Sequence, residues 1–140
     1  MKVLQLIGVI VFLFLFVSCN NNLTEFENEH PEGSVVLKYK IQQRADVDFL
    51  LEVLDINDTR CPIGSVCSDP GKVSVNLRVL TNSGVSETCL EFSEIPGRCY
   101  SCDTIENRRI EVFKVSPIPY ADKPTNLLTN YSVVVVVNDI

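Results

Sequence analysis

The feature that most constrains the fold of this chain is the alternation of apolar and polar residues over short stretches. Within residues 72–80, Val73, Val75, Leu77 and Val79 alternate with polar residues. Successive side chains of a β-strand point to opposite faces, so this spacing predicts a strand with one buried face. Residues 34–42 repeat the pattern, and their expected apolar face consists of Val35, Leu37, Tyr39 and Ile41.

Two further segments, residues 48–56 and 131–138, are apolar on both faces and are predicted to be central strands. Residues 85–92, residues 108–115 and the segment after Gly97 are shorter candidates. Gly- and Pro-containing stretches separate these runs, and no stretch has helical spacing over three turns. The sequence therefore predicts an all-β fold: a single small antiparallel β-sandwich or barrel-like sheet of six to seven strands with a disulfide-braced loop.

The N-terminus has the organisation of an export signal. Lys2 precedes an apolar run over residues 3–17, which as a helix would measure roughly 22 Å, short of the ~30 Å hydrocarbon core of a bilayer. The residues Phe16, Val17, Ser18 and Cys19 resemble the lipobox of a bacterial lipoprotein signal. The resemblance implies cleavage before Cys19 and a diacylglycerol and palmitate anchor at that cysteine. A plain signal peptide or a short membrane anchor is the alternative.

The chain then divides into three parts: a signal peptide over residues 1–18, a lipidated cysteine with a flexible tether over 19–33, and a β-sandwich domain over 34–140. The tether is polar and acidic and has too few apolar residues to fold alone. Asn20 after the cysteine resembles lipoproteins that are sent to the outer membrane, on its periplasmic or surface face. The net charge of −6 argues against nucleic acid as a partner.

Cys61 and Cys67 flank five residues that include Pro62 and Gly64. These two residues let the chain reverse, which brings the cysteine Cα atoms within the roughly 4.4–6.8 Å that a disulfide requires. An exported protein meets an oxidising compartment, so we expect a Cys61–Cys67 bond. Closing so short a loop stabilises the fold by about 2 kcal/mol, so the bond shapes a loop more than it holds a domain together.

Two other uses of the cysteines fit less well. Four cysteines could in principle bind zinc: Cys61, Cys67, Cys99 and Cys102. However, Cys61 and Cys67 are spaced more widely than paired zinc ligands usually are. A redox role for Cys99 and Cys102 needs a helix after Cys99, whereas the following residues predict a turn and a strand. We therefore expect no metal and no cofactor.

The remaining cysteines are assigned from a predicted hairpin. A four-residue loop over residues 94–97 would place Cys89 opposite Cys102, close enough to bridge. A two-residue turn at Pro96 and Gly97 would instead leave Cys102 diagonal to Cys89 on the same face. Both registers place Cys99 on the other face, so the prediction is a Cys89–Cys102 disulfide and a free Cys99, although a slip of one residue reverses the choice.

The segment Asp58, Thr59, Arg60, Cys61 and Pro62, followed by Cys67 and Gly71, resembles a motif of small exported proteins of the Bacteroidota, many of them lipoproteins. Their loop typically has Ser in place of Thr59 and a Trp-Ala portion before the glycine, which Ser68, Asp69 and Pro70 replace in this chain. The resemblance covers most of the mature chain, but it implies no activity.

Other candidate sites receive ordinary structural interpretations. Asp58, beside a tight turn, is expected to cap backbone N–H groups, and the set Asp55, Asn57 and Asp58 lacks the spacing of a calcium loop. The single histidine, His30, lies in the tether, which leaves no base for a catalytic triad. The carboxylate pairs Asp46/Asp48 and Glu91/Glu94 are predicted to be solvated strand ends or turns, so we expect no enzymatic activity.

Two functional hypotheses follow from these observations. The first is a lipid-anchored binding or structural module of the cell envelope that contacts a protein, peptide or glycan. The second is an envelope inhibitor or protective protein that presents the Cys61–Cys67 loop to an enzyme, with Ile63 or Val66 as the contact residue. In addition, residues 103–105 resemble the O-glycan acceptor pattern of exported Bacteroidota proteins, with Thr104 as the acceptor.

Overall fold

The computed structural model describes residues 30–93, 102–123 and 127–140. These ranges contain eight β-strands and a single-turn 3-10 helix, η1, at Leu128–Asn130. The strands are β1 (Ser34–Lys38), β2 (Gln43–Asp46), β3 (Phe49–Asp58), β4 (Val73–Thr81), β5 (Gly84–Phe92), β6 (Cys102–Ile105), β7 (Arg108–Ser116) and β8 (Ser132–Asp139). Within these ranges, no helix has the length and apolar character needed to cross a membrane.

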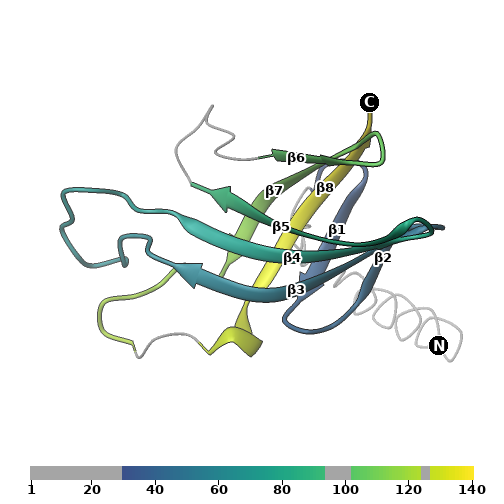
Figure 1. The fold of residues 1–140 in the computed structure, drawn as a ribbon. Helices are drawn as coiled ribbons and strands as arrows, with labels where there is room; N and C mark the ends of the chain where they lie inside the picture. Colours follow the sequence, from purple (N-terminus) through teal and green to yellow (C-terminus); the bar gives the residue numbers. More distant parts are fainter. Residues whose placement is uncertain (1–29, 94–101, 124–126) are drawn as a thin grey trace, which may run out of the picture.

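The strands form two four-stranded antiparallel sheets, ordered β1-β8-β7-β6 and β2-β3-β4-β5 (Figure 1). The predicted all-β sandwich is confirmed, and the strand count exceeds the expected six to seven. The unpredicted strand is β2, whose residues Gln43–Asp46 are mostly polar and show no clear alternation. It lies at the edge of its sheet, where a strand needs little apolar surface.

The core lies between the two sheets and follows the predicted alternation. Val73, Val75, Leu77 and Val79 of β4 are fully buried. They pack in one cluster with residues of β3, β7 and β8, so both sheets contribute to a single core. The two segments predicted to be central, β3 and β8, each have a strand on both sides.

The first predicted strand is shorter than its sequence pattern. β1 ends at Lys38, and Ile41, which was expected on the buried face, is about half exposed. Lys40 has a positive φ of 55°, and its amide donates to the Val53 carbonyl oxygen at 2.9 Å. The chain leaves one sheet here and enters the other as β2, a change of direction that alternation alone does not reveal.

Candidate functional site at the loop end of the sandwich

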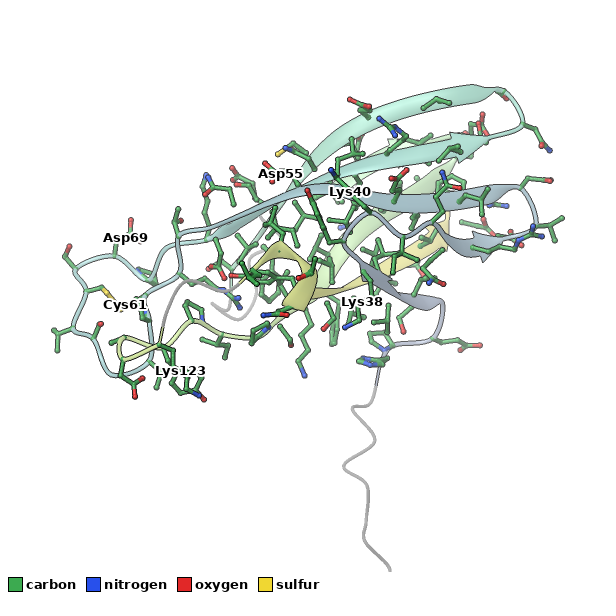
Figure 2. All side chains as sticks on the ribbon, turned by 90° about the horizontal axis from the view of Figure 1, so that it is seen from below. Lys38, Lys40, Asp55, Cys61, Asp69 and Lys123 are labelled. Carbon is green, nitrogen blue, oxygen red and sulfur yellow. A yellow bond between two sulfur atoms is a disulfide. The ribbon has the colours of Figure 1, made fainter. Side chains whose placement is uncertain are left out.

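Two long connections meet at one end of the sandwich, at the left of Figure 1. One is the β3–β4 loop, residues 59–72, and the other is the β7–β8 connection, residues 117–131. We call their described residues the loop end. Figure 2 shows Cys61 and Asp69 of the first loop close to Lys123 of the second, away from Asp55 of β3 and from Lys40 in the turn between β1 and β2. The loop end therefore combines segments from both sheets.

The base of the β3–β4 loop continues the hydrogen bonding of its two strands. The Thr59 amide donates to the Lys72 carbonyl oxygen at 2.9 Å, and the Cys61 amide donates to that of Pro70, also at 2.9 Å. Gly71 has a φ of +72°, and a Cβ there would overlap the Thr59 carbonyl group. Only glycine adopts this positive φ readily and also leaves room for the Thr59 carbonyl group. The glycine of the sequence motif therefore closes the base of this loop.

The tip of the loop is closed by the predicted Cys61–Cys67 disulfide, which is confirmed with a Cα–Cα distance of 6.0 Å. Within this ring the Ser65 amide donates to the Pro62 carbonyl oxygen at 3.0 Å, which forms a tight turn. Gly64 at the turn has a φ of +92°, a conformation that glycine adopts without strain. The reversal expected from Pro62 and Gly64 is therefore present.

A buried ion pair lies beneath this loop. Arg60 Nη2 is 2.7 Å from Asp58 Oδ2, and Arg60 Nε donates to Asp58 Oδ1 at 2.9 Å. The Arg60 and Asp58 side chains are only 4% and 7% exposed. Asp58 Oδ1 also accepts from the Arg60 backbone amide at 3.0 Å, which confirms the capping role expected for this carboxylate. The guanidinium and the carboxylate thus form a two-point contact that holds the turn between them.

The same ion pair joins the two sheets. Arg60 Nη1 donates to the Val115 carbonyl oxygen at 2.9 Å, and Arg60 Nη2 donates to that of Pro117 at 2.8 Å. The Tyr131 hydroxyl donates to Asp58 Oδ2 at 2.9 Å. Asp58 belongs to β3, whereas Val115 belongs to β7 and Tyr131 immediately precedes β8. Breaking the pair would therefore disturb both the loop and the contact between the sheets.

The pair also sets the ionisation of Asp58. Burial raises the pKa of this carboxyl, but the hydrogen bonds and positive charge of Arg60, with a further bond from Tyr131, outweigh burial and hold the pKa below its ordinary value of 3.8. Asp58 is consequently ionised at neutral pH, and its charge is fully compensated by partners within the fold.

The tip of the β3–β4 loop is docked on the β7–β8 connection by main-chain hydrogen bonds. The Ile63 amide donates to the Pro119 carbonyl oxygen at 2.9 Å, and the Ala121 amide donates to that of Ile63 at 3.0 Å. These bonds form an isolated parallel bridge between Ile63 and Tyr120. The disulfide loop is thus fixed at its base, across its ring and along one side.

Apolar side chains are exposed at this fixed end. Val66 is fully exposed, and Ile63 and Tyr120 are each nearly half exposed. The Lys123 ammonium lies over the Tyr120 ring, 4.6 Å from its centroid. Ile63 and Val66, the two contact residues proposed from the sequence, are therefore both exposed at the loop end, where the bridge also places Tyr120 beside Ile63. The sequence pattern had not indicated Tyr120, because its proximity depends on the bridge between the two loops.

The predicted Cys89–Cys102 disulfide is wrong. Cys89 and Cys102 are free and exposed. In the described residues β5 and β6 do not pair with each other as the prediction required, because β5 pairs with β4 in one sheet and β6 pairs with β7 in the other. Leu90, next to Cys89, is buried, and Ile105 of β6 packs against the core. Strand alternation therefore directs both cysteines away from the core, on the outer faces of different sheets.

The other candidate residues are dispersed. Thr104 is exposed on β6, as a glycan acceptor would need to be. Asp46 forms an ion pair with Arg108 at 2.6 Å, and Glu91 forms one with Lys72 at 2.6 Å. The described ranges contain no group of three or more His, Cys, Asp or Glu residues that could hold a metal ion. Cys19, Cys99 and the hairpin loop over residues 94–97 lie outside the described residues.

Sequence reasoning underestimated Arg60, which the structure places at the centre of the loop end. An arginine beside a turn is usually solvated. The available signal was its position two residues after Asp58, but the carbonyl groups that complete its environment come from residues 115 and 117.

Comparison with protein-family models, with curated protein sequences and with solved structures finds no match.

Proposed function

We propose that this chain is a lipid-anchored module of the bacterial outer membrane that binds a protein partner through its loop end. The observation that carries the proposal is the exposure of Val66, Ile63 and Tyr120 on loops that are fixed by a disulfide, a buried ion pair and main-chain hydrogen bonds. Single exposed apolar residues are common on protein surfaces. Three of them on one rigid end are more typical of a contact surface, because little conformational freedom is lost on binding.

The direction of the chain supports this arrangement. β1 begins at Ser34, which pairs with Val136, whereas the loop end adjoins Ser132 at the other end of β8. A tether that joins Cys19 to Ser34 would therefore enter the domain away from the loop end. An anchored domain of this kind could direct its loops away from the membrane, toward the periplasm or the cell exterior.

Site-specific photo-crosslinking tests the binding role. A photoreactive amino acid replaces Val66 in the full-length chain, produced in a Bacteroidota host, and a matched variant carries it at Val85, an exposed valine of β5. We expect a discrete crosslinked protein from position 66 and none from position 85. Equal labelling from both positions, or none from position 66, would refute a contact at the loop end.

The anchor is tested separately with Cys19→Ala. We expect this variant to lose labelling by palmitate and to leave the membrane fraction, because the lipid supplies the attachment. Unchanged palmitate labelling and unchanged detergent partitioning would show that Cys19 is not the anchored residue. Crosslinking from position 66 in the same cells shows whether anchoring and binding depend on each other.

A further inference from the structure

We infer that the partner of the loop end is an endopeptidase that accepts small apolar side chains, and that the segment around Val66 occupies its active-site cleft as a substrate would. This inference rests on the proposed binding role and names the class of partner. Val66 stands fully exposed in the Cys61–Cys67 ring, so its side chain is free to enter a pocket of another molecule. Its size suits a small apolar primary pocket, such as that of elastase-type serine peptidases.

The main chain beside Val66 is also available to a partner. The backbone groups of Val66, Cys67 and Ser68 form no hydrogen bond with the main chain of any residue that the structure describes. Peptides commonly bind to clefts through main-chain hydrogen bonds, while alternate side chains enter pockets and provide specificity. The segment thus offers both elements of substrate-like recognition: unpaired peptide groups and one apolar side chain that projects from them.

The residues on either side of Val66 restrain it. Cys67 directly follows Val66 and is joined to Cys61 by the disulfide. The turn closed by the Ser65 amide directly precedes Val66. Ile63 is bonded on the other side of the turn to Pro119 and Ala121. A segment that is already ordered binds more tightly than a flexible substrate of the same sequence. If water hydrolysed the Val66–Cys67 peptide bond to a carboxylate and an amine, the disulfide would still hold the two new chain ends together.

Inhibition assays test this inference with two peptidases of opposite specificity. The full-length protein in detergent is titrated against an elastase-type and a trypsin-type serine peptidase, each with a small chromogenic substrate. We expect competitive inhibition of the elastase-type enzyme alone. In Val66→Lys, inhibition of that enzyme should fall at least about 100-fold, and inhibition of the trypsin-type enzyme should appear, because its pocket binds a cationic side chain.

Val85→Lys is the matched control, since it adds the same charge to an exposed valine on β5 and should leave both inhibition constants unchanged. Because Val66 is fully exposed, thermal melts of Val66→Lys and the unmodified protein should coincide. Absence of inhibition, rapid cleavage of the loop without inhibition, or an unchanged specificity in Val66→Lys would overturn the inference. If crosslinking from position 66 still captured a partner, the binding role would stand and only the peptidase class would be wrong.

Discussion

Two arginine–aspartate pairs of this protein have nearly the same length but very different surroundings. Arg60 and Asp58 approach to 2.7 Å at the loop end, where both side chains are less than a tenth exposed. Arg108 and Asp46 approach to 2.6 Å, but their side chains are 23% and 49% exposed. The second pair also joins the two sheets, since Arg108 belongs to β7 and Asp46 to β2.

We infer from this comparison that burial, rather than distance, decides what each pair contributes to the stability of the fold. Exposed pairs contribute about 0–1 kcal/mol, because water and salt screen their attraction. Removing one member of a buried pair leaves an uncompensated charge, which costs roughly 3–5 kcal/mol. The loop end should therefore depend on its ion pair, whereas the Arg108 pair should be dispensable.

Arg60→Met gives the largest expected effect. The substitution leaves the Asp58 carboxylate buried with the Tyr131 hydroxyl but without its positive partner, and it removes the donors to Val115 and Pro117. We expect the free energy of unfolding to fall by about 3–5 kcal/mol. Urea denaturation followed by circular dichroism measures this change. A loss below about 1 kcal/mol would mean that burial does not distinguish the two pairs.

Gly71→Ala should have the next largest effect, because a Cβ at this position would overlap the Thr59 carbonyl group in a backbone with positive φ. We expect a loss of about 2–3 kcal/mol or more, since the base of the loop must shift. Gly64→Ala is the matched control in the same loop. Its φ is also positive, but the nearest neighbour, the Ala121 Cβ, is 3.8 Å away, so only the backbone strain of about 1 kcal/mol applies. Equal losses in the two variants would contradict the close approach at Gly71.

Acid should weaken the loop end through Asp58. Its pKa in the folded chain lies below 3.8, so the unfolded chain binds a proton at this site more readily than the folded chain does. The stability that the ionised carboxylate provides is complete above about pH 4 and is lost as the pH falls through the folded pKa. Urea midpoints measured from neutral to acidic pH should decline less steeply in Asp58→Asn than in the unmodified protein. Parallel curves would show that Asp58 does not contribute.

Arg108→Met should have the smallest effect, because its pair with Asp46 is much more exposed to solvent than the Arg60–Asp58 pair. We expect a loss of about 0–1 kcal/mol in the same urea experiment. Arg108 also lies over the Phe49 ring, 5.1 Å from its centroid, and the methionine side chain can retain part of that apolar contact. A loss comparable to that of Arg60→Met would remove the distinction between the two regions.

The parts of the fold that depend on local sequence pattern were predictable. The alternation over residues 73–79 identified β4, and the valine run identified β8 as a central strand. The Cys61–Cys67 bond was predictable for the same reason, since five intervening residues with a proline and a glycine determine the geometry almost alone. In each case the deciding contacts lie within a few residues of one another in the chain.

The parts of the fold that depend on which of the two sheets a strand joins were not predictable. The hairpin proposed for Cys89 and Cys102 assumed that neighbouring strands pair, as they do in β4 and β5. β5 and β6 instead lie in different sheets, and local spacing does not reveal which of these arrangements a chain adopts. Arg60 was missed on similar grounds, because its partners Val115 and Pro117 are more than fifty positions away. Arg60 lies beside a turn, and only the tertiary arrangement buries its side chain.

The central claim is that the Arg60–Asp58 pair fixes the loop that presents Val66. Amide hydrogen exchange tests it most directly, because the Ile63 and Ala121 amides form the two bonds that dock this loop. We predict that both amides are protected in the unmodified protein and in Arg108→Met. In Arg60→Met, under conditions where the core of β4 remains protected, both should exchange at the rate of an open loop. Rapid exchange at both amides in the unmodified protein, or full protection in Arg60→Met, would contradict the account.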